Sequence, residues 1–146
     1  MFTLLIATDF TDSARHALQT ALTVAEHAAP STLYLVHVLS GSEAGQKATL
    51  ANMAESDKLA TALLAEVDVV RKGAALPAGV HLHCIVLRGD PATVIADEAN
   101  AHKCDLVVVG TRGRKGLERF VLGSVAEAIT QRAPCSVLTV KSKSSS

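Results

Sequence analysis

The segment DLVVVGTRGRKGLERFVLGS, residues 105–124, connects an apolar run to the start of a helix through a basic stretch rich in glycine. The run at 106–109 is continuously apolar, as expected for a strand that is covered on both faces. The residues after it, SVAEAITQR, have the composition of a helix. This order predicts a fold in which buried strands alternate with helices.

Four other short apolar runs extend this pattern along the chain, and helical patterns fill the gaps between them. Strict alternation of strands and helices predicts an α/β fold, with one doubly wound parallel sheet and helices on both faces. The third and fifth runs carry polar residues, which is typical of edge strands, so the expected strand order is 3-2-1-4-5. The five runs are TLLIA (3–7), TLYLVHV (32–38), VHLHCIVL (80–87), DLVVVG (105–110) and SVLTV (136–140).

Residues that favour helix ends lie at the borders of the helical patterns. Small polar side chains cap helix starts, proline suits the first helical position, and glycine suits the position after the end. A serine or threonine followed three residues later by glutamate forms a capping box. The predicted boundary residues are Thr11 or Asp12 for the first helix, Gly73 as the end of the second, Asp90 with Pro91 for the third, and Ser124 with Glu127 for the fourth.

The composition is that of one globular domain, which we place at 1–141, with a loop at 40–47 and a disordered polar tail at 142–146. The 14 basic residues equal the 14 acidic ones, so no global field attracts nucleic acid or acidic membranes. The amino-terminal segment lacks a basic leader, and no apolar run reaches the roughly 20 residues of a membrane helix. We therefore expect a cytoplasmic protein.

The three cysteines, Cys84, Cys104 and Cys135, lie in or beside apolar runs without the spacing of a metal site. Their number is odd, and free cysteine is usually a buried apolar residue. We expect reduced, buried thiols, as in a cytosolic protein.

Three histidines and an RGD tripeptide need separate interpretations. His37 ends a central strand and is expected to be a packed, hydrogen-bonded imidazole in preference to a catalytic base. His81 and His83 share one face of an edge strand, where solvent exposure is favoured over a metal site. The RGD sequence at 88–90 is explained by a turn followed by a helix cap.

The glycines of the opening segment suit a polyphosphate site. Glycine lets a ligand approach the backbone, and successive N–H groups in such a turn form a concave anion nest. The following helix adds free N–H groups and the positive end of its dipole. Alternatively, Gly110 ends a strand, Gly113 and Gly116 serve turns, and Ser124 only caps a helix. Neither a Walker A loop nor a GxGxxG motif after the first strand is present.

The spacing G-x2-G-x9-G-[S/T], here GTRGRKGLERFVLGS, resembles the ATP-binding motif of the universal stress protein family. The resemblance covers nearly the whole chain through LLIATDFTDSARHAL, LYLVHV, VLRGDPATVIADEA, CDLVVVGTRG and APCSVLTVK. It implies the same strand order, in a fold similar to the adenine nucleotide α-hydrolases.

The resemblance also implies a role for individual residues in holding ATP, with Mg²⁺ or Mn²⁺ on its phosphates. Many members have proline or valine where this chain has Ala7, a mild departure. The implied contacts are Ala7, Thr8 and Asp9 at the adenine and ribose, Val38 through its backbone at the adenine, Val109, Gly110, Gly113 and Arg114 along the ribose and phosphates, and Gly123, Ser124 and Val125 at the phosphate chain.

By this resemblance the chain is expected to be an ATP-binding stress-response protein that forms a homodimer through its last strand, Ser136–Val140. Dedicated catalysis is not expected, because Asp9 is the only strong acidic candidate at the site. A slow ATPase and a nucleotide-free dimeric scaffold are the alternatives. AMP or another adenylate in place of ATP also stays open.

Overall fold

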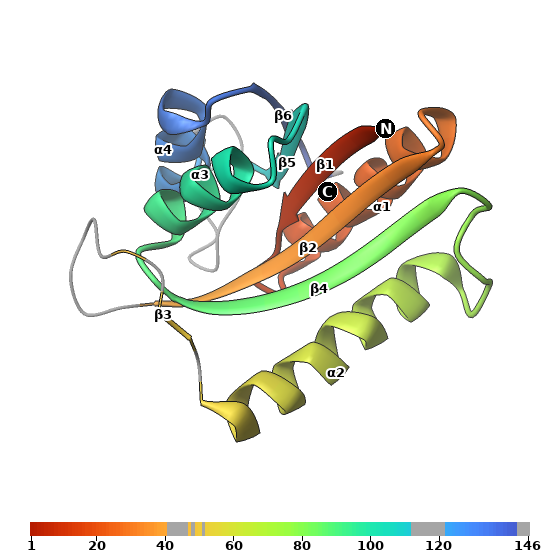
Figure 1. Ribbon diagram of the computed structural model, residues 1–146, viewed down its shortest axis with the longest axis horizontal. Helices are drawn as coiled ribbons and strands as arrows, with labels where there is room; N and C mark the ends of the chain where they lie inside the picture. Colours follow the sequence, from red (N-terminus) through yellow and green to blue (C-terminus); the bar gives the residue numbers. More distant parts are fainter. Residues whose placement is uncertain (41–46, 48, 51, 112–121, 143–146) are drawn as a thin grey trace.

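The computed structural model describes residues 1–40, 47, 49–50, 52–111 and 122–142. Its helices and strands alternate along most of the chain (Figure 1). The strands are β1 (Phe2–Ala7), β2 (Ser31–Ser40), β3 (Thr49–Leu50), β4 (Val80–Gly89), β5 (Leu106–Gly110) and β6 (Ser136–Val140). The helices are α1 (Asp12–His27), α2 (Met53–Arg71), α3 (Pro91–Ala101) and α4 (Ser124–Arg132).

The sheet has the order β3-β4-β2-β1-β5-β6, and its five longer strands run parallel. Without β3, this is the predicted order 3-2-1-4-5, so the expected α/β fold is confirmed. The two-residue strand β3 was not predicted; it pairs antiparallel with the end of β4, opposite Leu87 and Arg88. Two residues carry no alternating pattern, so the sequence around them cannot indicate a strand.

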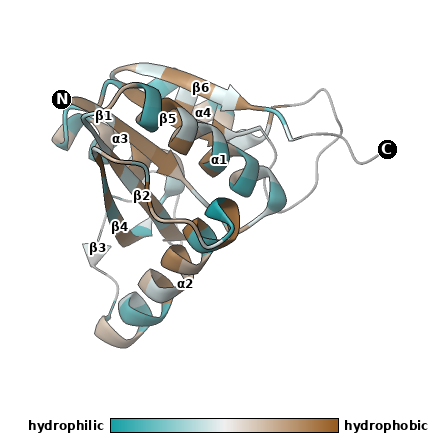
Figure 2. Ribbon diagram, turned by 90° about the vertical axis from the view of Figure 1, so that its right-hand side faces the viewer, coloured by the Kyte–Doolittle hydropathy of each residue, from teal (hydrophilic) through white to brown (hydrophobic). Residues whose placement is uncertain are grey.

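Helices cover both faces of the sheet, as the continuous apolar strands predict. On one face, Leu4 and Ile6 of β1 pack with α1 and α2, and on the other, Leu5 packs with α3 and α4. This separation follows from the two-residue period of a strand, which sends successive side chains to opposite faces. Figure 2 shows both hydrophobic and hydrophilic segments along α1 and α2, as expected for helices with one face on the sheet.

The predicted start of α3 is confirmed, and its contacts explain the RGD tripeptide. Asp90 is the N-cap and accepts a hydrogen bond from the backbone N–H of Thr93, with Pro91 in the first turn. Arg88 forms an ion pair with Glu55 of α2 at 2.9 Å. The arginine therefore ties β4 to α2, and the aspartate starts a helix.

The other boundary predictions have mixed outcomes. Thr11 caps α1, as expected, and α2 ends at Arg71, where Lys72 takes the left-handed conformation next to the predicted Gly73. Of the predicted loop at 40–47, Ser40 instead ends β2, and 41–46 lie outside the described residues, as do 143–146 of the predicted tail. Within the described part of the chain, no helix is long and apolar enough to cross a membrane.

Candidate functional site

A pocket of about 810 Å³ lies at the carboxyl ends of the central strands. Its walls come from the ends of β1, β2 and β5 and from the first residues of α3 and α4. In doubly wound sheets this is where the direction of winding reverses and where ligands bind. The lining residues are Ala7, Thr8, Asp9, Ala14, Val36, His37, Val38, Leu39, Ser40, Pro91, Ile95, Val109, Gly110, Gly123, Ser124, Val125 and Ala126.

The predicted site residues can be compared directly with this lining. Eleven residues were predicted; Gly113 and Arg114 lie outside the described residues. The remaining nine all line the pocket, although they come from four separate segments of the chain. These nine are Ala7, Thr8, Asp9, Val38, Val109, Gly110, Gly123, Ser124 and Val125.

The turn between β1 and α1 holds its shape through its own side chains. Thr8 accepts a hydrogen bond from the N–H of Phe10, and Asp9 accepts one from the N–H of Thr11. Phe10 has a φ of 64°, which is rare for a residue with a large side chain. Each polar side chain thus satisfies the backbone two residues further on, and the turn presents Asp9 to the pocket.

His37 is packed and hydrogen-bonded, as predicted. Only 6% of its surface is exposed, and its ring centroid lies 4.7 Å from that of Phe10. Its Nδ1 is 2.8 Å from the carbonyl oxygen of Thr8. Because a carbonyl oxygen only accepts, Nδ1 carries the hydrogen in this contact. The imidazole therefore braces the β1 end against β2.

Residue 110 must be glycine because β5 and the first turn of α1 approach each other closely at this position. A Cβ atom added there would lie 2.6 Å from Ser13 Oγ and 2.8 Å from the Ser13 carbonyl oxygen. Real Cβ atoms do not approach other atoms this closely, so the first turn of α1 packs on β5 only because residue 110 is glycine. Gly110 lines the pocket, but helix packing alone already requires it.

The predicted capping box at the start of α4 is wrong. Gly123 is the N-cap, and as a glycine it makes no side-chain capping hydrogen bond. Gly123 has extended backbone angles (φ −58°, ψ 149°), and its N–H donates to the Thr111 carbonyl oxygen at 2.7 Å. This bond starts the helix one residue early, so Ser124 is already helical and cannot cap it. The first turn of α4 lines the pocket with its positive dipole end.

Several pocket residues were missed by sequence reasoning. The predicted second strand stopped at Val38, but β2 continues through Leu39 and Ser40, which extend the pocket wall. Pro91 and Ile95 also line the pocket. The residues Gly89, Asp90 and Pro91 indicated where α3 begins. They did not indicate that the first turn of this helix faces the same pocket.

The cysteines are free thiols, as predicted, but only Cys104 is buried; Cys84 and Cys135, which were also predicted to be buried, are partly exposed. Cys104 is 7% exposed, and burial raises its pKa to about 12. Burial also raises the pKa values of Cys84 and Cys135. A thiol with a raised pKa forms little of the reactive thiolate near neutral pH, so these side chains behave as apolar residues.

The predicted solvent exposure of His81 and His83 is confirmed. His83 stacks on Tyr34, with ring centroids 5.2 Å apart. The described residues contain no group of three or more histidine, cysteine, aspartate or glutamate side chains that could hold a metal ion.

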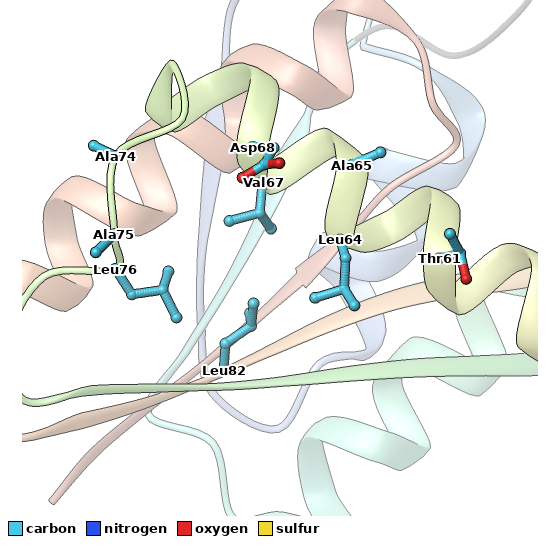
Figure 3. Close-up of a pocket in the computed structure, with 9 residues that line it drawn as sticks. All are labelled: Thr61, Leu64, Ala65, Val67, Asp68, Ala74, Ala75, Leu76 and Leu82. Carbon is cyan, nitrogen blue, oxygen red and sulfur yellow. The ribbon is translucent and has the colours of Figure 1, made fainter.

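A second hollow of about 460 Å³ lies between α2 and β4 (Figure 3). Its walls are mostly apolar; Leu64, Val67 and Leu82 point into the space between the helix and the strand (Figure 3). Asp68 is the one charged side chain among its described lining residues. It has neither a strand carboxyl end nor a helix start, so the first pocket is the candidate site.

The chain matches the universal stress protein family over residues 1–141. It belongs to that family. Among curated relatives, a universal stress protein of Thermus aquaticus is 30% identical over 145 residues, which are 95% of this chain and 98% of the relative. One from Methanocaldococcus jannaschii is 51% identical over 63 residues, only 43% of this chain and 37% of the relative.

Solved universal stress proteins share the fold. UspA from Lactobacillus plantarum is 26% identical, with a TM-score of 0.69 over 95% of this chain and 97% of its own. A universal stress protein in complex with cAMP has 22% identity and a TM-score of 0.69, covering 97% and 98% of the two chains. A family protein from Arabidopsis thaliana with AMP bound has 22% identity and a TM-score of 0.62, covering 99% and 94%. At such identities the last two similarities establish the fold alone.

Proposed function

We propose that this universal stress protein binds an adenine nucleotide, ATP with Mg²⁺ or Mn²⁺ on its phosphates, in the pocket at the carboxyl ends of β1 and β5. The observation that carries the proposal is the lining: one pocket collects every described residue that the sequence motif implied as a contact. Its volume of about 810 Å³ suits a nucleotide, because small-molecule sites usually span roughly 300–1,000 Å³. Two solved family members carry cAMP and AMP.

Each wall of the pocket suits one part of a nucleotide. The backbone of Val38, near the carboxyl end of β2, supplies amide groups for the base, and Ala7 and Thr8 line the same pocket. The Asp9 carboxylate accepts hydrogen bonds from ribose hydroxyls. The start of α4 supplies backbone N–H groups and a positive dipole end for the phosphates, because its N-cap, Gly123, has no side chain to occupy them.

The same lining argues for a binding role in preference to dedicated catalysis. Asp9 is the only acidic side chain among the described lining residues. Phosphoryl transfer requires metal ligands and a group that positions the nucleophile, which a single carboxylate does not provide. We propose a regulatory stress-response protein in which the bound nucleotide stabilises the folded protein, so that nucleotide occupancy acts as the signal. Its free thiols are consistent with a cytoplasmic location.

The direct test is to denature the purified protein, identify any released nucleotide by mass spectrometry, and titrate ATP, AMP and cAMP with and without Mg²⁺ by calorimetry. We expect carried-over adenine nucleotide or a dissociation constant for ATP in the micromolar range or below. Absence of both would overturn the nucleotide proposal and favour the nucleotide-free scaffold. If AMP or cAMP binds more tightly than ATP, that nucleotide is the proposed ligand in place of ATP.

We also propose that the protein forms a homodimer through β6. This strand pairs only with β5 among the described strands, which leaves its other edge open. Leu138 in its centre is 36% exposed, and an open edge with an apolar side chain favours pairing with a second copy.

Replacement of Leu138 by lysine tests the dimer, because it places a charge beside its own copy at a two-fold axis. Light scattering after size exclusion should give the mass of a dimer for the wild type and of a monomer for Leu138→Lys. Val69→Lys is the matched control, since Val69 is a 52% exposed apolar residue on α2. A monomeric wild-type protein, or a Leu138→Lys variant that stays dimeric, contradicts the proposed interface.

A further inference from the structure

The hydroxyl group of Thr11 connects the pocket to helix α1. It donates a hydrogen bond to Asp9 Oδ1 at 2.5 Å and accepts one from the backbone N–H of Ala14 at 3.2 Å. A hydroxyl has one hydrogen to donate and two lone pairs, so both bonds form at once. One side chain therefore caps the helix and binds the pocket carboxylate.

Asp9 is held from two directions by this one residue. Its Oδ1 also accepts a hydrogen bond from the backbone N–H of Thr11 at 3.1 Å. Two donors on a single oxygen restrict rotation about the side-chain bonds of Asp9. The left-handed Phe10 between the two residues turns the chain back so that both donors reach the carboxylate.

We propose that Thr11 is a positioning residue for the nucleotide: its hydroxyl holds the Asp9 carboxylate in the orientation that accepts a hydrogen bond from a ribose hydroxyl. This inference rests on the proposed nucleotide function. Holding the carboxylate before the ligand arrives spares the loss of side-chain freedom on binding, which raises affinity without a new contact to the ligand. The Thr11 hydroxyl acts on the ligand only through Asp9.

A simpler role has to be separated from this one, because Thr11 also caps α1. A residue that only caps a helix changes the stability of the whole fold and leaves the affinity of the folded protein unchanged. A positioning residue changes the affinity as well, and its effect depends on the ligand group that Asp9 contacts.

The first measurement compares Thr11→Val, Thr11→Ser and Asn52→Ala with the wild type by calorimetric titration of ATP and by thermal unfolding. Asn52→Ala is the matched control, because Asn52 caps α2 outside the pocket lining. Thr11→Val should raise the dissociation constant about tenfold, as expected for one hydrogen bond to a charged group. Thr11→Ser keeps the hydroxyl and should bind within about twofold of the wild type. Asn52→Ala should lower the unfolding temperature and leave affinity unchanged.

The second measurement removes the ribose hydroxyls one at a time. Wild type and Thr11→Val are titrated with ATP, 2′-deoxy-ATP and 3′-deoxy-ATP. If Thr11 acts through Asp9, the deficit of Thr11→Val shrinks to about twofold with the analogue that lacks the contacted hydroxyl, because the two losses are coupled. An equal deficit with all three nucleotides, or wild-type affinity in Thr11→Val, overturns the positioning role and leaves a helix cap. No binding by the wild type overturns the proposed function itself.

Discussion

Helices α3 and α4 both begin at the pocket, but their first turns differ. Pro91 and Ser124, the first residues of the two helices, both line it. In α3 the Asp90 carboxylate accepts hydrogen bonds from the N–H and the hydroxyl of Thr93. In α4 the N-cap is Gly123, which has no side chain that could cap the first turn. The Asp90 carboxylate occupies an N–H group at the start of α3 and offsets its positive dipole end, whereas Gly123 has no side chain that could occupy the N–H groups of α4, although Glu127 lies in that first turn.

Two glycines of the same motif differ in a similar way. Gly110 is required by packing, since a side chain there would collide with Ser13. Gly123 has backbone angles that any residue adopts, so its conformation does not require glycine. At this position the glycine leaves the N-cap of α4 without a capping side chain. Two glycines of one motif therefore have different structural roles, and substitutions at each position can distinguish these roles.

The largest expected effect is on stability, from Gly110→Ala. The added methyl group meets a backbone oxygen that cannot move alone, so we expect a loss of about 3 kcal/mol in the free energy of unfolding. Urea unfolding followed by circular dichroism measures it. In a Ser13→Ala background the same substitution should cost less, because one of the two colliding oxygens is gone. A loss below about 0.5 kcal/mol would contradict the packing explanation.

The next effect is on affinity, from Gly123→Asp, which gives α4 the kind of cap that α3 has. The carboxylate takes the place of an anion at the helix start, so the dissociation constant for ATP should rise by about tenfold to a hundredfold. Stability should change by only about 0.3 kcal/mol, because glycine is itself a well-tolerated N-cap residue.

Gly123→Asn is the control for this change, because asparagine caps without a charge and should weaken binding less. Calorimetry and urea unfolding measure both quantities. Unchanged affinity in Gly123→Asp would mean that the phosphates do not lie at α4.

The smallest effect is expected from Asp90→Ala, which opens α3. Loss of the cap should lower the free energy of unfolding by about 1 kcal/mol. Arg132 lies 3.6 Å from Asp90, but its side chain is 52% exposed, so this ion pair adds little. ATP affinity should stay within about twofold of the wild type, as measured by the same titration. A tenfold change in affinity would show that both helix starts take part in binding.

Much of this fold was predictable because its elements have local causes. The buried central strands appear in the sequence as continuous apolar runs, and Asp90 with Pro91 indicated the start of α3. The sequence-based predictions fail where a contact with another segment of the chain determines the local structure. Thr111 anchors Gly123 and moves the start of α4 one residue before the predicted cap, and β3 exists only because the end of β4 lies beside it.

Sequence alone established the α/β class and the strand order, since periodicity and helix caps are properties of the chain itself. The family resemblance of its glycine motif implied nine of the residues that line the pocket. The tertiary structure determined which structural roles those residues have. Three contacts join segments that lie apart in the chain. Ser13 packs against Gly110, His37 binds the carbonyl oxygen of Thr8, and Gly123 at the start of α4 binds that of Thr111. Steric fit and hydrogen bonds of this kind depend on three-dimensional proximity, which no spacing along the sequence specifies.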